Sequence, residues 1–93
     1  MILSFKCRST GELAAGRRVK DFEQIEVVAR RKLRMVEAAT KLSDLKAPPN
    51  NKLEALKGDR AGQHSIRIND KWRVCFVWAN GNASDVEIVD YHD

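Results

Sequence analysis

The feature that most constrains the fold is an alternation of apolar and polar side chains between residues 65 and 78. A period of two is typical of β-strands that bury one face. The apolar side chains of this pattern are those of Ile66, Ile68, Trp72, Val74, Phe76 and Trp78. We therefore expect two strands, Ser65–Ile68 and Trp72–Trp78, with both tryptophans packed in the core rather than stacked on nucleic-acid bases.

The turn between these strands decides which side chains face each other. A three-residue turn, Asn69–Lys71, places Ile68 opposite Trp72, so that apolar groups meet apolar groups. The same register places Arg67 opposite Arg73. Two arginines side by side repel each other, which predicts a negative charge between them. The candidates for this charge are the carboxylates of Glu87 and Asp90 and a bound phosphate.

Upstream of this hairpin, apolar residues recur every three or four positions, which is the period of a helix with one buried face. They are Ile25, Val28, Ala29, Leu33 and Val36. This main helix is expected to begin at a cap formed by Asp21. Ser9 and Glu12 have the spacing of a capping box, which predicts a shorter helix that ends near Gly16.

Two short strands complete the expected fold. Ile2–Phe5 is an apolar run before the first helix, and a last strand through Val86 to Asp90 follows a turn at Asn80–Asn82. Between the main helix and the hairpin, Pro48–Asn51 predicts a loop. The order is β-α-α-β-β-β, an α+β class in which a small antiparallel sheet packs against two N-terminal helices. At 93 residues the chain is expected to form a single domain, residues 1–93.

Neither export nor a metal site is expected. The longest apolar runs fall short of the roughly 18 residues of a membrane span, and Met1–Lys6 is too short for a signal peptide, which predicts a cytoplasmic protein. Cys7 and Cys75 lie far apart, without a CxxC spacing or nearby histidines, which argues against zinc and against a disulfide framework. We expect two buried free thiols that serve packing.

The net charge of +4 is unevenly distributed along the chain. Residues 1–57 carry 13 Lys and Arg against 7 Asp and Glu, whereas residues 58–93 carry 4 against 6. Arg30, Arg31 and Arg34 lie on the polar face of the main helix. This face is either the solvated side that any amphipathic helix has, or a collective contact for RNA or for an acidic protein.

The C-terminal sequence Asp90-Tyr91-His92 follows the last strand, and the loop 57–60 leads into the hairpin. A strand end and a loop can share a cleft with Arg67 and Arg73. RNA cleavage without a metal needs a base, an acid and cations, and Asp, His and Tyr together with Arg and Lys provide them. The alternative interpretation is a chain end without a catalytic role, in which Tyr91 packs on the core.

Four motifs, in order along the chain, resemble those of HigB-type plasmid-maintenance killer toxins in the RelE-like toxin family. They are Leu56–Arg60, Gly62–Ile68, Trp72-Arg73 and Asp90-Tyr91-His92. The resemblance implies the RelE-like microbial ribonuclease fold, binding in the ribosomal A site, and metal-free cleavage of the mRNA there by 2′-hydroxyl attack, giving a cyclic phosphate without any cofactor. It also implies a cognate antitoxin with a helix-turn-helix domain, through which alone the toxin would meet DNA.

The same resemblance assigns roles to individual residues. Lys57 and Arg73 would stabilise the phosphate and the transition state, Asp90 and His92 would transfer or orient protons, and Tyr91 would stack on or orient the substrate. Further contacts to RNA are implied for Arg60 and Arg67 and, toward ribosomal RNA, for Arg30, Arg31, Lys32 and Arg34.

One departure from the family pattern concerns Glu54. Members of the family often carry histidine in the sequence Leu-His-Pro-Leu-Lys-Gly, whereas Leu53–Gly58 of this chain reads Leu-Glu-Ala-Leu-Lys-Gly. Either Glu54 is itself the base, or the activity is weaker than in the family. If activity is lost, the alternative function is a non-catalytic basic module that binds RNA or the ribosome.

Overall fold

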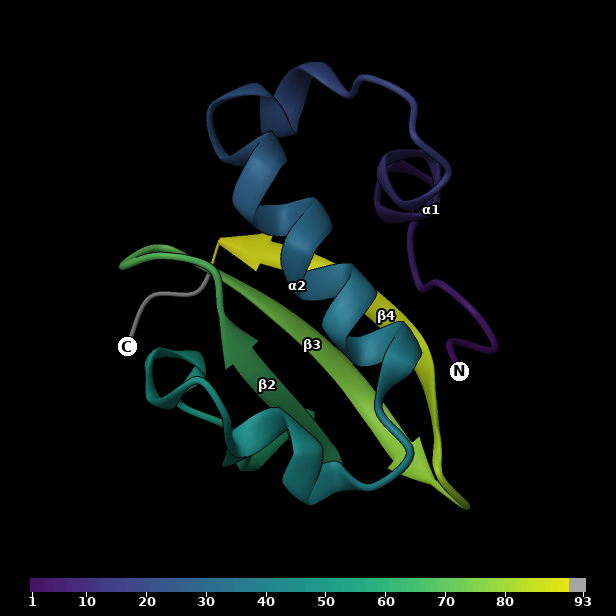
Figure 1. Ribbon diagram of the computed structural model, residues 1–93, viewed down its shortest axis with the longest axis vertical. Helices are drawn as coiled ribbons and strands as arrows, with labels where there is room; N and C mark the ends of the chain where they lie inside the picture. Colours follow the sequence, from purple (N-terminus) through teal and green to yellow (C-terminus); the bar gives the residue numbers. More distant parts are fainter. Residues whose placement is uncertain (91–93) are drawn as a thin grey trace.

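In the computed structural model, which describes residues 1–90, a four-stranded antiparallel sheet packs against a layer of helices (Figure 1). The strands, which lie in this order across the sheet, are β1 (Glu54–Ala55), β2 (Gln63–Arg67), β3 (Trp72–Ala79) and β4 (Asn82–Asp90). The helices are α1 (Arg8–Ala14) and α2 (Glu26–Ala38). The short 3-10 turns are η1 (Lys20–Ile25), η2 (Leu42–Lys46), η3 (Pro49–Asn51) and η4 (Gly58–Arg60). The predicted α+β class is therefore confirmed.

The β2–β3 hairpin has the predicted register. Arg67 pairs with Arg73, and the amide of Ile68 donates to the carbonyl of Trp72 at 2.9 Å. The turn is closed by Asn69, whose side-chain oxygen accepts hydrogen bonds from the amides of residues 71 and 72, each at 2.9 Å. An asparagine that binds amides two and three residues ahead favours a tight turn, which explains why the three-residue connection forms.

The core lies between α2 and the face of the sheet that the alternation predicted. Ile66, Val74 and Phe76 are fully buried, as are Ala29 and Val36 on the helix. Trp72 and Trp78 are partly buried against this cluster, and their rings pack edge-on, with centroids 5.7 Å from Phe22 and 6.3 Å from Phe76. The prediction that the tryptophans serve packing is confirmed. Within residues 1–90, no helix has both the length and the apolar character needed to cross a bilayer.

The N-terminal segment differs from the expected strand. It runs parallel to β4 through two isolated bridges, Ile2 to Ala83 and Phe5 to Val86. The predicted capping box is wrong, because α1 begins at Arg8 and no side chain caps its first turn. Thr10 instead accepts a hydrogen bond from the amide of Ile88 at 3.0 Å, so a tertiary contact with the edge of β4 outweighs the local cap.

The start of the main helix also differs from the prediction. The turn η1 occupies residues 20–25, and α2 begins only at Glu26, so Asp21 does not cap it. Phe22 and Ile25 are both buried in η1. One turn with a 3-10 period places residues three positions apart on the same side, so both can face the core. Packing against the core therefore sets the local conformation here.

Asn51 forms a buried polar centre where a plain loop was expected. Its side-chain nitrogen donates to the carbonyls of Leu45 and Ala47 at 3.1 and 3.2 Å, and its oxygen accepts from the Lys32 ammonium at 2.5 Å. Lys32 is only 4% exposed although it lies among the basic residues of α2. These bonds tie the segment that leads into β1 to the main helix.

We expect Asn51→Ala to lower the free energy of unfolding by about 3 kcal/mol, because it leaves two carbonyls and an ammonium without their buried partner. The measurement is urea-induced unfolding followed by circular dichroism. The neighbouring exposed Asn50→Ala is the matched control and should change the free energy of unfolding by less than about 0.5 kcal/mol. Equal losses in the two variants would contradict the role given to Asn51.

Candidate active site and RNA-binding surface

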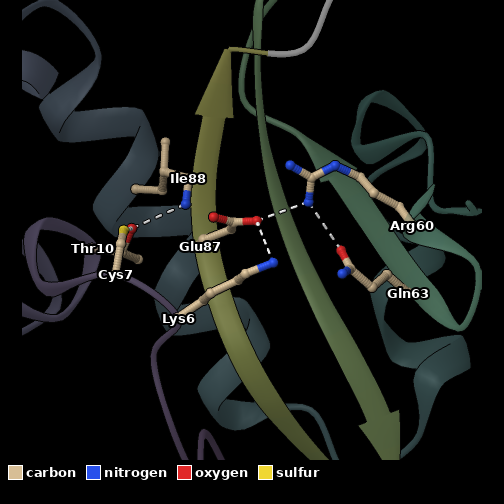
Figure 2. Close-up of polar contacts among 7 residues, drawn as sticks. All are labelled: Lys6, Cys7, Thr10, Arg60, Gln63, Glu87 and Ile88. Carbon is tan, nitrogen blue, oxygen red and sulfur yellow. Dashed lines mark hydrogen bonds and ion pairs between the residues drawn. The ribbon is translucent and has the colours of Figure 1, made fainter.

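The face of the sheet that points away from the core carries polar side chains from all four strands, and we call it the outer face. It takes alternate residues of the strands, with a shift of register in β3–β4 between Cys75 and Val77. The side chains of this face used below are those of Glu54, Gln63, Ser65, Arg67, Arg73, Cys75 and Glu87. Charged groups from η4 and from the N-terminal segment reach the same face (Figure 2).

Arg73 is a cation of the outer face that two neighbouring side chains hold in place. One of its terminal nitrogens lies 3.2 Å from the carboxylate of Glu54 and donates to the hydroxyl of Ser65 at 3.2 Å. The side chain of Arg73 is 15% exposed and that of Glu54 is 48% exposed, so the pair is fixed on one side and open to solvent on the other. An arginine held in this way can receive a phosphate without first being ordered.

The predicted need for negative charge beside the two paired arginines is confirmed, but through residues that the sequence had not suggested. Glu54 supplies a carboxylate to Arg73, and Asp70 forms an ion pair with Arg67. Glu54 reaches the outer face because it pairs with Ser65 across β1 and β2, and the two-residue strand β1 was not predicted. The Asp70 contact spans only three residues within the turn.

A second charged cluster surrounds Glu87 (Figure 2). Its carboxylate accepts a hydrogen bond from Arg60 at 2.8 Å and lies 3.8 Å from the ammonium of Lys6. The same nitrogen of Arg60 also donates to the side-chain oxygen of Gln63 at 3.2 Å. Four separate segments of the chain therefore meet at one point of the outer face.

Cys75 lies beneath these charges. It is 1% exposed, and burial raises the pKa of its thiol to about 11, although the positive charges of Arg60, Arg73 and Lys6 act in the opposite direction. The thiol is therefore protonated at neutral pH, and the predicted packing role is confirmed. Cys7 is only partly buried, and its sulfur lies 2.9 Å from the hydroxyl of Thr10.

The remaining predicted catalytic positions lie near the ends of elements. Lys57 is exposed and directly precedes η4. Asp90 is exposed at the end of β4, where it pairs with Trp72 and follows the residue opposite Arg73. Tyr91 and His92 lie outside the described residues.

Arg30 joins the two helices. Its guanidinium donates to the carbonyl of Leu13 at 3.3 Å and to that of Arg17 at 2.7 Å, and it lies 3.5 Å from the carboxylate of Glu26. A cation at the C-terminus of α1 satisfies carbonyls that the helix leaves unpaired. Arg30 thus has a structural role, whereas Arg31 and Arg34 are exposed.

A groove of about 430 Å³ brings together two arginines that were predicted separately. Arg31 from α2 and Arg67 from β2 line it together with the nearly buried Lys32. The other lining residues within residues 1–90 are Val28, Pro48, Asn50, Ile68 and Asn69, so no carboxylate of this part of the chain lines the groove. Burial, and then the charge of Arg31, lower the pKa of Lys32. Cations that crowd one another in this way favour an anion between them.

Comparisons with known proteins identify the family of the chain. Residues 16–92 match the family model described as RelE-like toxin of type II toxin-antitoxin system HigB. Toxin HigB-1 of Vibrio cholerae is 44% identical over 59 residues, which cover 63% of this chain and 62% of that protein. Endoribonuclease HigB of Proteus vulgaris is 38% identical over 61 residues, or 66% of this chain and 65% of that protein. The matched segment thus spans just under two thirds of each relative.

Two solved structures share the fold over nearly the whole chain. The YoeB-YefM complex from Staphylococcus aureus superposes with a TM-score of 0.62 at 18% identity, covering 100% of this chain and 97% of that one. The YoeB dimer from the same organism has a TM-score of 0.59 at 19% identity, with 99% and 95% covered. This likeness confirms the predicted RelE-like fold. Because the family model covers more than half of the chain, the chain belongs to the RelE-like toxins of the HigB type II toxin-antitoxin system.

Proposed function

We propose that this chain is a ribosome-dependent mRNA endoribonuclease that inhibits translation as the toxin of a type II pair. The observation that carries the proposal is the position of Arg73, held by Glu54 and Ser65 on an open face of the sheet. Membership of the HigB family and the name of the Proteus relative, Endoribonuclease HigB, support it.

In the proposed reaction, a 2′-hydroxyl of the mRNA attacks the adjacent phosphorus. A base takes the hydroxyl proton, cations stabilise the charge of the phosphorane, and an acid protonates the departing 5′-oxygen. The products are a 2′,3′-cyclic phosphate and a 5′-hydroxyl. Arg73 and Lys57 are the proposed phosphate ligands.

Proton transfer is assigned to the carboxyl-terminal motif and to Glu54. Asp90 and His92 transfer or orient protons, and Tyr91 stacks on or orients the substrate. Glu54 is the candidate base, because its carboxylate lies 3.2 Å from the arginine that would hold the phosphate and is half exposed. A base must lie within reach of the proton that it removes, and the short distance between Glu54 and Arg73 supports this assignment.

The route of the RNA backbone is proposed to include the groove of Arg31, Lys32 and Arg67. Contacts from these cations, and from the exposed Arg34, bind phosphates without reading the base sequence. Such contacts suit a protein that meets both ribosomal RNA and mRNA of any sequence. Binding of this kind is expected to weaken as the salt concentration rises.

The proposed regulatory partner is a cognate antitoxin with a helix-turn-helix domain, through which alone the toxin would meet DNA. The similar structure from Staphylococcus aureus is a complex of YoeB with YefM, which supports an antitoxin partner; the helix-turn-helix domain is implied by the family resemblance alone. The proposed place of action is the cytoplasm, where translating ribosomes are found.

The proposed activity is tested by adding the purified protein to a defined translation reaction and mapping the mRNA ends by primer extension. We expect cuts within the A-site codon when ribosomes are present, and intact mRNA when they are omitted. Salt-sensitive binding to ribosomes without any cut would instead identify a non-catalytic ribosome-binding module.

Glu54→Gln is expected to lower the cleavage rate by about 100-fold, because the amide still accepts a hydrogen bond from Arg73 but cannot take a proton. Glu54→His is the matched variant and should retain cleavage, because imidazole can accept a proton at the same position. Both rates are measured on ribosomes under single-turnover conditions. A parental rate for Glu54→Gln would show that Glu54 only holds Arg73.

A further inference from the structure

We infer that Glu87 is a positioning residue, which holds Arg60 and the loop of η4 over the outer face so that Arg60 can bind the RNA backbone. The inference rests on the proposed function and extends it to a residue that lies outside the recognised motifs. It arises from contacts between segments that are far apart in the sequence.

The contacts of Glu87 mark it as the fixed member of its cluster (Figure 2). Its side chain is 13% exposed, compared with 31% for Arg60 and 53% for Lys6, both of which reach toward it from the surface. The hydrogen bond from Arg60 is short, at 2.8 Å, and the same nitrogen is also bound by Gln63. A largely buried carboxylate with two cationic neighbours loses a charged partner when either cation moves, and the loss is greater for the closer Arg60.

In the inferred role, the Arg60–Glu87 contact helps to hold the loop around η4 in position. None of the residues Gly58–Arg60 is buried, so the turn has little packing of its own. Gly58, the first residue of η4, and Gly62, two residues after its end, have φ angles of 63° and 91°, which residues other than glycine rarely adopt. A loop with few buried contacts has low local stability, and the Arg60–Glu87 ion pair joins it to the middle of β4.

The position of Arg60 relative to Arg73 explains how the Arg60–Glu87 contact would serve RNA binding. Glu87 pairs with Cys75 across β3 and β4, and Cys75 pairs with Ser65 across β2 and β3. Arg60 and Lys6 contact Glu87, and Arg73 donates a hydrogen bond to Ser65, so these cations lie around one area of the outer face. A phosphate bound by Arg73 would leave Arg60 beside the same stretch of RNA backbone, where it contributes to binding rather than to proton transfer.

The experiment is a double-mutant cycle with Glu87→Gln, Arg60→Ala and the double variant, measured as single-turnover cleavage on ribosomes at increasing protein concentration. Glu87→Gln and Arg60→Ala should each raise the half-saturating concentration by about tenfold while the maximal rate stays within about threefold. The double variant should bind no more weakly than either single variant, because both substitutions remove the same interaction.

The matched control is Asp85→Asn, which removes one negative charge from the same strand at an exposed position. Asparagine tolerates the φ of 50° at this position, and the half-saturating concentration should be unchanged or slightly lower. The control therefore separates the loss of the Arg60 contact from a general change in net charge. Thermal unfolding of each variant shows whether the fold is intact, and Arg60→Ala, on a surface turn, tests the inference even if Glu87→Gln unfolds.

An unchanged half-saturating concentration in Glu87→Gln would overturn the inference, and so would additive losses in the double variant. A parent protein that cuts no mRNA would instead show that the proposed function has failed. In that case the same double-mutant cycle is measured by equilibrium binding to ribosomes. Non-additive losses of affinity would support the positioning role, whereas additive losses or no loss would reject it.

Discussion

Replacing Arg73 by alanine is expected to lower the rate of mRNA cleavage on ribosomes by about 10² to 10³-fold, the usual effect of removing one pre-organised group that stabilises a charged transition state. Arg73 is held by Glu54 and Ser65 at 3.2 Å each and is 15% exposed, so it is ordered before RNA arrives. The rate is measured under single-turnover conditions, which separate the chemical step from product release.

Arg67→Ala is the matched control for this prediction. Arg67 is the direct cross-strand neighbour of Arg73, has the same side chain, and pairs with the exposed Asp70 in the turn. It lines the groove that also contains Arg31 and Lys32, so Arg67→Ala should weaken ribosome binding by about tenfold or less and leave the maximal rate of cleavage nearly unchanged. Equal losses of maximal rate in the two variants would contradict the special role of Arg73.

His92→Ala is expected to lower cleavage by about 10² to 10⁴-fold, the range for the loss of a general acid or base. The prediction rests on the closing sequence Asp90-Tyr91-His92 and on the family to which the chain belongs. Expression of the variant should also relieve growth inhibition, which gives a second measurement in living cells.

The other histidine of the chain supplies the control. His64 lies on β2, and its ring stacks on that of Phe76 with centroids 6.4 Å apart. His64→Gln removes an imidazole without touching the outer face, and the cleavage rate should stay within about threefold of the parent. A large loss of cleavage in His64→Gln together with a parental rate in His92→Ala would contradict the assignment of proton transfer to His92.

Elements whose structure depends on residues close together in the chain could be predicted from the sequence. The register of the β2–β3 hairpin follows from alternation and turn length, and it places Arg67 opposite Arg73 as expected. The buried face of α2 follows from its period, which is seen in Ala29, Leu33 and Val36. Within such elements the conformation of each residue depends mainly on its neighbours in sequence.

Features that depend on distant contacts could not be predicted. The strand β1 has two residues, too few for an alternation, yet it places Glu54 beside Arg73. The Arg60–Glu87 ion pair spans 27 residues, and neither side chain carries a local signal of the other. Lys32 was placed with the exposed cations of α2, although burial against Asn51 gives it another environment. Tertiary packing, rather than local propensity, set these contacts.

The most direct test of the central claim uses two mRNAs that differ by one oxygen atom. One is all-ribose, and the other carries a single 2′-deoxy nucleotide at the position in the A-site codon where the first is cut. The claim predicts cleavage of the all-ribose mRNA with a 5′-hydroxyl on the downstream fragment, and no cleavage of the deoxy mRNA although ribosome binding is equal. Cleavage of both mRNAs at the same rate would contradict an attack by the 2′-hydroxyl and the roles given to Arg73, Glu54 and His92.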